Sequence, residues 1–299
     1  MSYRIEPDEP VEHALRRVAH EQLDKALREI DDSELDVHRT VHQVRKRCKK
    51  LRALVRLVRE SFDGYDDANR AFRDAARLVS DLRDAQVHVE TIAALRDTRA
   101  PVLDDGVLAP IQRRLEAHRD ELVGTPEGAE RRVEEVRAAL LKAEAAVDDW
   151  ALDDDGYDAV AGGLRKTYGR ARARMEDAYE DETVEAFHQW RKRCKYHRYH
   201  VRLLQDFWPN PLRALREELH DLTDLLGDAH DRAELSDAVD ARFAEGEAVE
   251  ARRALRAFLD QDRAELRARA RVLGDKLFAE DADGFVARLG AIWSASRAA

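Results

Sequence analysis

Apolar side chains recur at alternating intervals of three and four residues along most of the chain, which is the pattern of amphipathic helices. The segment from Val41 to Arg59 is the clearest case. Its apolar positions form one stripe of a helix: Val41, Val44, Cys48, Leu51, Val55 and Val58. Strand-type alternation is nearly absent, so the pattern predicts an all-α protein.

Stretches rich in Gly, Pro or Asp interrupt this pattern and divide it into predicted helices. The first half should contain helices near residues 11–30, 66–96, 108–123 and 129–150, and a helix around His42 that is capped by Ser33 or Asp36 and ends near residue 62. The second half should contain helices near residues 157–179, 212–245, 248–278 and 285–293, and a helix around His188 that stops at Trp208. An acidic stretch at residues 148–156 lies between the halves.

The helix around His42 has a near-copy around His188, and such a repeat is a signal about the whole fold. The shared pairs are His42/His188, Gln43/Gln189, Arg45/Arg191, Lys46/Lys192, Arg47/Arg193, Cys48/Cys194, Lys49/Lys195, Arg52/Arg198, Val55/Val201, Arg56/Arg202 and Leu57/Leu203. Weaker matches extend into the neighbouring helices. We therefore expect a unit of about four long helices that occurs twice through internal duplication, in residues 1–150 and 151–299.

Cations form a second stripe on both helices. The stripes consist of His42, Arg45, Lys46, Lys49, Arg52 and Arg56, and of His188, Arg191, Lys192, Lys195, Arg198 and Arg202. Neither Val41–Arg59 nor Phe187–Gln205 contains an Asp or Glu. Like charges one turn apart on a helix cost about 0.2–0.5 kcal/mol per pair. Because this repulsion is left in place twice, the pattern indicates an anion supplied from outside.

The overall composition makes the cationic stripes more distinctive. The chain has 62 Asp and Glu against 52 Lys and Arg, a net charge of −10, so a general attraction for polyanions is excluded. Only nine lysines occur, and five of them lie in these two helices: Lys46, Lys49, Lys50, Lys192 and Lys195. An acidic protein with segregated cations is typical of a local anion site. Cys48 and Cys194 occupy equivalent apolar positions and should be buried thiols, not a disulfide.

The paired H-x-x-R-K-x-x-K-x-x-R helices resemble the CHAD family, whose name stands for conserved histidine α-helical domain. Two flanking motifs support the resemblance, which runs from about residue 11 to 278: Leu15-Arg16-Arg17 with Leu164-Arg165-Lys166, and Leu78 to Asp84 with Leu225 to Asp231. Membership implies two four-helix bundles related by a pseudo-twofold axis, a central cavity or groove lined by basic residues, and binding of inorganic polyphosphate. No E-x-E-x-K segment of a triphosphate-processing domain is present, so the chain resembles a free-standing member.

The stripes suit a linear phosphate polymer, because Arg offers a planar fork to phosphate oxygens and Lys a compact point charge. His42 and His188 either donate to phosphate or hold a neighbouring helix through a carboxylate. A second set of candidate ligands lies on the preceding helices: Arg16, Arg17, Arg165, Lys166, Arg170 and Arg174. We expect Asp84 and Asp231 to orient an arginine or cap a turn. Three further histidines, His197, His200 and His230, either enlarge the second site or lie on a solvated face.

These patterns favour a binding protein over an enzyme. The glycine loop and clustered carboxylates that phosphoanhydride chemistry uses are missing from the stripes, so no catalytic residue, metal or cofactor is expected. One alternative is a nucleic-acid-binding helical protein, which the net charge and the lack of a known binding motif disfavour. A polyphosphate-processing enzyme is a weaker alternative.

Neither an apolar leader nor an apolar run long enough to span a bilayer occurs. We therefore expect a cytoplasmic protein without membrane contact, with polyphosphate granules as a candidate location.

Overall fold

The computed structural model describes residues 3–99, 105–243 and 248–297. The described residues form eleven α-helices and one 3-10 turn, with no strand, so the all-α prediction is confirmed. The helices of the first half are α1 (Val11–Ile30), α2 (Val37–Leu57), α3 (Tyr65–Arg77), α4 (Ser80–Arg99), α5 (Asp105–Val123) and α6 (Pro126–Glu144). Those of the second half are α7 (Asp158–Asp181), α8 (Val184–Leu203), α9 (Pro209–Arg242), α10 (Val249–Leu277) and α11 (Ala282–Arg297), with the 3-10 turn η1 (Gln205–Phe207) after α8.

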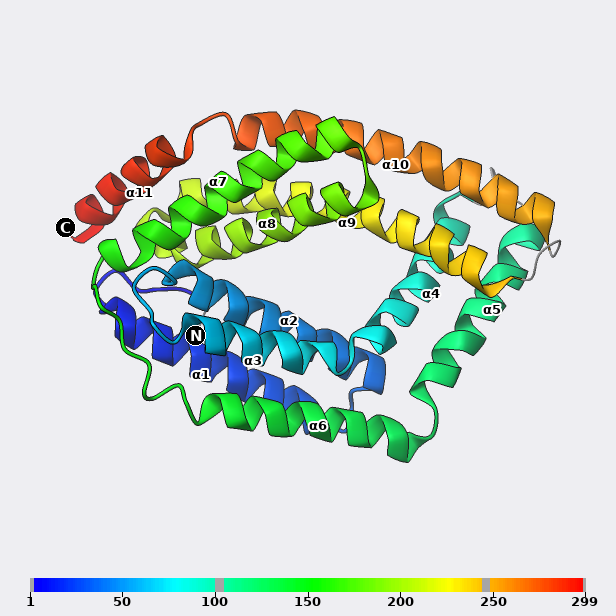
Figure 1. Cartoon of the computed structure of the whole chain (residues 1–299), viewed down its shortest axis with the longest axis horizontal. Helices are drawn as coiled ribbons and strands as arrows, with labels where there is room; N and C mark the ends of the chain where they lie inside the picture. Colours follow the sequence, from blue (N-terminus) through cyan, green and yellow to red (C-terminus); the bar gives the residue numbers. More distant parts are fainter. Residues whose placement is uncertain (1–2, 100–104, 244–247, 298–299) are drawn as a thin grey trace.

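Two groups of long helices make up most of the molecule (Figure 1). Helices α1, α2, α3 and α6 pack together, and α7, α8, α9 and α10 form the second group. Helix α11 packs on α7 and η1. This arrangement is consistent with the two predicted bundles. Within the described residues, no helix is long and apolar enough to cross a membrane.

Helix α2 forms where the pattern predicts it. The Asp36 carboxylate accepts a hydrogen bond from the Arg39 backbone N–H at 2.9 Å, so Asp36 and not Ser33 is the N-cap. The apolar stripe of α2 is buried, and Cys48 and the equivalent Cys194 of α8 are free, buried thiols as predicted. Burial of one stripe leaves the cations of the same helix on its other side.

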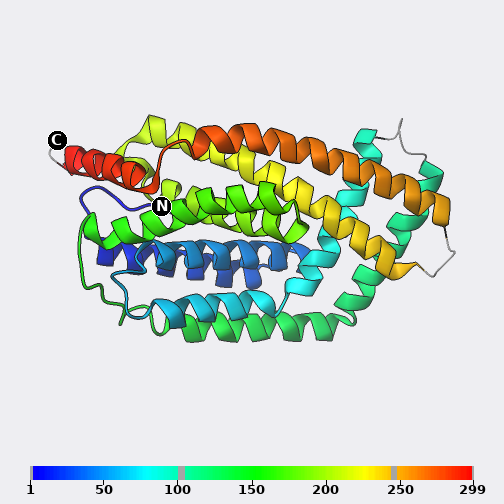
Figure 2. The same ribbon diagram turned by 45° about the horizontal axis from the view of Figure 1, so that its top comes forward.

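The prediction of one helix over residues 66–96 is wrong, because the chain bends between α3 and α4. The Ser80 hydroxyl donates to the Arg77 carbonyl oxygen at 3.0 Å in this bend. Helices α4 and α5 leave the first bundle and reach the far ends of α9 and α10 (Figures 1 and 2). There the apolar residues of both halves share a second core: Val89, Ile92, Leu95, Leu108, Ile111, Leu115, Leu235, Ala238, Val239, Leu255 and Leu259. The bend buries apolar side chains that a straight helix would carry away from any partner.

Helix α9 shows no such bend and is continuous over 34 residues. Its predicted end at Glu245 lies outside the described residues.

The two halves also meet where α2 and α8 end. A Cβ atom added to Gly163 of α7 would lie 1.9 Å from the Leu57 carbonyl oxygen, so only glycine permits this approach of α7 to α2. One turn before Leu57 on α2, the Ala53 carbonyl oxygen accepts a hydrogen bond from the His200 Nε2 of α8 at 2.9 Å. These contacts hold the C-terminal ends of α2 and α8 together.

The acidic stretch between the halves packs on the same end of the molecule. The Asp153 backbone N–H donates to the Ser61 carbonyl oxygen at 2.9 Å, and the Asp155 carboxylate accepts from the Val11 N–H at 3.0 Å. These hydrogen bonds tie the linker to the first half. The division into units of residues 1–150 and 151–299 stays a prediction.

Candidate functional site

The cation stripes of α2 and α8 lie close to one another, although the sequence separates them widely. The Arg56 guanidinium of α2 lies 4.6 Å from the ring centroid of Tyr196 of α8, and that of Arg52 lies 5.9 Å from it. Nearer the middle of the helices, the charge of Arg191 acts on Lys49. We call this region the α2–α8 cationic surface: His42, Arg45, Lys46, Lys49, Arg52, Arg56, His188, Arg191, Lys192, Lys195 and Arg198. The last predicted cation of the second stripe, Arg202, is instead near Arg216, Arg4 and Tyr3.

Most cations of this surface have no carboxylate partner. Arg45 is the exception, with a nitrogen 3.7 Å from the Asp84 carboxylate. Within the described residues, no carboxylate oxygen lies within 4.0 Å of the others: Lys46, Lys49, Arg52, Arg56, Arg191, Lys192, Lys195 and Arg198. The surface therefore carries a dense positive charge that the protein does not itself neutralise.

Neutral side chains hold the arginines of this surface in place. Arg52 and Arg56 both donate to the Asn69 side-chain oxygen of α3, at 3.2 and 2.8 Å. Arg56 also donates to the Tyr65 hydroxyl at 2.9 Å, and Arg198 donates to the Thr223 hydroxyl at 3.0 Å. Hydrogen bonds to amides and hydroxyls fix the direction of a guanidinium without cancelling its charge. These contacts leave the charges available to an anion.

Lys49 and Lys195 are accessible to solvent yet poorly hydrated. The Lys49 side chain is exposed, but desolvation by the surrounding protein, helped by the charges of Arg45 and Arg191, lowers its pKa to about 8. Lys195 is half-buried, and desolvation followed by the charges of Arg191 and Lys49 holds its pKa well below that of a free lysine. An accessible amine with a large desolvation penalty has protein on several sides. An anion bound here would favour the charged form of both lysines.

Asp84 and Asp231, which were predicted to orient an arginine or cap a turn, each interact with an arginine of the cationic surface. Asp84 approaches Arg45, and the negative charge of Asp231 acts on Arg191. Burial raises the pKa of both carboxyls, while the neighbouring arginines oppose that rise. Arg191 also lies against Gly227 of α9, where an added Cβ would be 3.3 Å from its Nη2. Because Gly227 has no side chain, the Arg191 guanidinium can lie against the backbone of α9.

His42 and His188 lie on the cationic side of their helices, as predicted. The His42 side chain is exposed, yet partial desolvation by the neighbouring protein, followed by the positive charges of Arg83 and Lys46, lowers its pKa. His188 packs against His230 with ring centroids 4.3 Å apart and ring planes tilted by 37°. Burial, followed by the charges of Lys192 and Arg191, lowers the pKa of His188 to about 4. Neither ring has a hydrogen-bonded carboxylate among the described residues. Both imidazoles are therefore neutral at pH 7.

The expectation for His197 and His200 is wrong, whereas His230 does join the second stripe. His197 and His200 are 1% and 0% exposed, so they lie neither at the cationic surface nor on a solvated face. His197 packs edge-on against Tyr168 with ring centroids 5.2 Å apart. Burial lowers the pKa of both histidines to about 3. Both are neutral core residues: His197 packs within the second half, and His200 bonds to Ala53 of the first half.

The second set of predicted ligands, on α1 and α7, has a different environment. The ion pairs are Arg16–Glu12 at 2.8 Å, Arg17–Glu9 at 2.7 Å, Arg17–Glu21 at 2.9 Å, Arg165–Asp283 at 2.7 Å, Lys166–Glu60 at 2.9 Å and Arg174–Asp177 at 2.6 Å. Arg170 is exposed, and the described residues provide it with no ion pair. The Glu9 carboxylate raises the pKa of Arg17 through a hydrogen bond. Five of these six cations thus have a partner within the protein, and their part in ligand binding stays a prediction.

Arg193 is a candidate that sequence reasoning missed. It belongs to the aligned pair Arg47/Arg193 but lies outside the stripe. Arg47 forms an ion pair with Glu29 at 2.5 Å, whereas Arg193 has no carboxylate partner in the described part of the chain. Desolvation and then the charges of Arg170 and Arg56 lower the pKa of Arg193. The alignment contained this residue, but only the fold distinguishes it from its paired counterpart.

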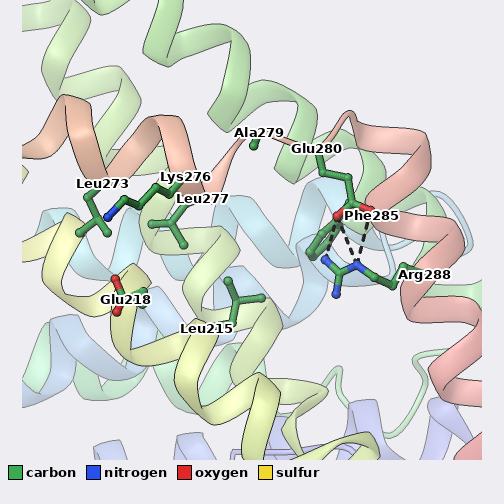
Figure 3. A pocket seen from close by; sticks show the side chains of 9 residues that line it. All are labelled: Leu215, Glu218, Leu273, Lys276, Leu277, Ala279, Glu280, Phe285 and Arg288. Atoms are coloured by element: carbon green, nitrogen blue, oxygen red, sulfur yellow. Dashed lines mark hydrogen bonds and ion pairs between the residues drawn. The ribbon is translucent and has the colours of Figure 1, made fainter.

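A cavity of about 360 Å³ lies apart from the cationic surface, between α9, α10 and α11 (Figure 3). It is lined by Leu215, Glu218, Leu273, Lys276, Leu277, Ala279, Glu280, Phe285 and Arg288, and by none of the predicted ligands. Arg288 is held by Glu280 at 2.8 Å. No cluster of three or more His, Cys, Asp or Glu suited to a metal ion occurs among the described residues.

Comparison with known proteins identifies one family for this chain. A family model described as the CHAD domain matches residues 17–240, which include every residue of the α2–α8 cationic surface. Comparison with curated proteins gave no match. CHAD domains are known in polyphosphate-related proteins. Because the match spans more than half of this chain, the chain belongs to the CHAD family.

Proposed function

We propose that the protein binds inorganic polyphosphate, or a similar linear phosphate polyanion, along the α2–α8 cationic surface. One observation carries the proposal. Apart from Arg45, the lysines and arginines of the α2–α8 cationic surface lack carboxylate partners, and three of its arginines are oriented by Asn69, Tyr65 and Thr223, while most of the predicted cations on α1 and α7 are paired. Such a surface costs stability unless an external anion neutralises it.

The chemistry of the surface suits a polymer of repeating charge. Cations recur about once per helical turn on two adjacent helices, so successive phosphates meet successive donors without any reading of sequence. Arginine forks bind phosphate oxygens in pairs, and lysines add point charges. Binding would release counterions and weaken steeply with salt, as it does for nucleic-acid backbones.

The proposed role is binding without turnover. Asp84 lies 3.7 Å from Arg45, and the charge of Asp231 acts on Arg191, which suits the positioning of arginines better than the activation of a nucleophile. Association with polyphosphate granules in the cytoplasm would be the biological setting. Incubating the protein with polyphosphate and Mg²⁺ should release no phosphate, and steady release would replace this proposal with that of a polyphosphate-processing enzyme.

A competition titration by calorimetry tests the proposal. Long-chain polyphosphate, single-stranded DNA and duplex DNA are titrated at moderate salt into the natural protein and into the variant Arg45→Ala/Lys46→Ala/Arg191→Ala/Lys192→Ala. We expect tight polyphosphate binding that DNA does not displace and that the quadruple variant loses while remaining folded. Equal or tighter binding of DNA would favour the nucleic-acid alternative.

A charge-matched control separates the surface from net charge. Four exposed cations of α10 are replaced in Arg253→Ala/Arg256→Ala/Arg271→Ala/Lys276→Ala, which removes the same charge far along the chain from α2 and α8. This variant should bind polyphosphate like the natural protein. Equal losses in the two variants would show that binding follows total charge and would contradict a specific surface.

A further inference from the structure

Lys50 lies on α2 outside the α2–α8 cationic surface, next to the N-terminal segment. Its ammonium is 5.4 Å from the ring centroid of Tyr3, and the Tyr3 hydroxyl donates to the Lys50 carbonyl oxygen at 2.6 Å. Two residues on, the Ile5 N–H donates to the Leu203 carbonyl oxygen at the end of α8 at 2.8 Å. The N-terminal segment thus spans from α2 to α8 and covers Lys50, which is only 7% exposed.

The strongest charges acting on Lys50 are all positive. They come from Arg47, Arg202, Lys46 and Lys25. No carboxylate in the described part of the chain lies within 4.0 Å of Lys50 or Arg202.

Nearby acids pair with the outer arginines of this cluster instead. Asp206 binds Arg4 at 2.5 Å, Glu217 lies 3.3 Å from Arg216, and Glu29 holds Arg47. Arg4 and Arg216 are in turn the main positive charges near Arg202. Lys50 and Arg202 therefore remain unneutralised, although Arg4, Arg47 and Arg216 around them are paired.

Arg202 adds a donor without an acceptor. Its Nε is buried and makes no hydrogen bond. Burial, followed by repulsion from Arg47 and Arg202, lowers the pKa of Lys50 to about 7. A buried ammonium in a cationic environment either loses its proton or gains an anion.

We propose that Lys50 and Arg202 form a second anion site, for a small tetrahedral oxyanion such as phosphate, that is separate from the α2–α8 cationic surface. A lysine point charge and an arginine fork together match the charge and geometry of a phosphate dianion. The rings of Tyr3 and Tyr199, with centroids 5.9 Å apart, flank the site and favour a compact ligand.

Tyr199 lies between residues of the two sites along the contacts of the fold. The Arg198 guanidinium of the cationic surface is 5.4 Å from its ring centroid, and its ring meets that of Tyr3 edge-on. Arg202 belongs to the predicted stripe of α8, but Lys50 is outside both stripes. The proposal therefore does not depend on polymer binding by the α2–α8 cationic surface.

Lysine NMR on the full chain tests the site directly. With ¹³C at the ε carbon, the nine lysines give few signals, and Lys50→Met assigns the one of interest. We expect inorganic phosphate to raise the pKa of Lys50 from about 7 toward the usual value of a lysine, while the exposed Lys142 serves as an unaffected internal control. Arg202→Gln should weaken this response about tenfold, as loss of a charge-assisted hydrogen bond predicts.

A polymer arm distinguishes the source of the oxyanion. The same titration with long-chain polyphosphate is made in the natural protein and in Arg191→Ala/Lys192→Ala, which disables the main surface. A Lys50 response that survives in this variant supports a separate site, whether free phosphate or the polymer causes it. A response lost in this variant shows one continuous site and overturns the proposal. The proposal is also overturned if neither phosphate nor polymer changes the pKa of Lys50. It is likewise overturned if Arg202→Gln leaves the response of Lys50 to phosphate unchanged.

Discussion

Most of the predicted cations on α1 and α7 have carboxylates beside them, whereas most of those in the α2–α8 cationic surface lie next to other cations. Arg17 shows the first environment, with Glu9 and Glu21 both within 2.9 Å. Lys195 shows the second, since Arg191 and Lys49 are among its nearest charges and both lower its pKa. In sequence these residues are all basic positions on amphipathic helices. The fold assigns one group to internal neutralisation and leaves the other open.

This difference separates two uses of positive charge. A paired cation stabilises the fold, because removing it leaves a carboxylate poorly hydrated and alone. An unpaired cation in a cationic cluster destabilises the free protein and stabilises a complex with an anion. Stability and binding should therefore respond in opposite ways to substitutions in the two groups, as they often do at functional sites.

The largest effect on stability is expected for Arg17→Met. The substitution leaves Glu9, which is 8% exposed, without its main partner. We expect the free energy of unfolding to fall by about 2–3 kcal/mol, somewhat less than for a fully buried ion pair. Urea unfolding measures it, with the exposed Arg28→Met of the same helix as a control. A loss no larger than in that control would contradict a structural role for Arg17.

Lys195→Met should instead raise the free energy of unfolding of the free protein. Methionine keeps the apolar stem and removes a poorly hydrated charge that repels Arg191 and Lys49. The free energy of unfolding should rise by about 0.5–1 kcal/mol, while polyphosphate binding weakens. Thermal unfolding with and without polyphosphate measures both quantities, and Lys142→Met is the exposed control. Destabilisation of the free protein would show that Lys195 is already neutralised.

Polyphosphate affinity should depend on pH in a defined direction. Lys49 has a pKa of about 8 in the free protein, and a bound polyanion raises it. Affinity is then constant just below pH 8 and falls as the pH rises above 8, because the free protein loses a proton that the complex keeps. His188, with a pKa of about 4, adds a gain in affinity as the pH falls toward that value. Calorimetry in two buffers of different ionisation enthalpy should detect proton uptake on binding, and proton release would contradict this account.

The smallest expected effect comes from Gly227→Ala, next to Arg191. Alanine favours the helix by up to about 1 kcal/mol over glycine, so the free protein should become slightly more stable. The added Cβ would press on the Arg191 guanidinium at 3.3 Å and shift it, which should reduce affinity by less than about fivefold. Gly169→Ala of α7, where the new Cβ would make an ordinary contact at 3.5 Å, is the matched control. Equal affinities for the two variants would show that the position of Arg191 is not critical.

Much of the helical framework could be predicted from the sequence, because apolar periodicity and the Asp36 cap are local signals. The cation stripes of α2 and α8 were also visible, since eleven identical pairs of residues mark the repeat. The bend between α3 and α4 was not, because no Gly or Pro marks Leu78 and Val79. Its cause is the distant second core, in which Val89 and Ile92 meet α9 and α10.

The partners of individual cations could not be predicted either. Arg47 and Arg193 are equivalent in the repeat, yet only Arg47 meets a carboxylate. His200 reads as a polar position beside a cationic stripe, but the close approach of α7 and α8 to α2 buries it. Each of these outcomes depends on which helix lies opposite, and a single sequence carries little information about that.

The salt dependence of polyphosphate binding tests the comparison most directly, since its slope counts the phosphates that the protein neutralises. The slope would be measured for the natural protein, for Arg45→Ala/Lys46→Ala/Arg191→Ala/Lys192→Ala, and for Arg165→Ala/Lys166→Ala/Arg174→Ala. We predict a slope smaller by about 3 in the first variant, from roughly 0.7–0.9 per lost contact, and nearly unchanged in the second. A loss per residue as large in the second variant as in the first would contradict the claim that unpaired cations form the binding surface.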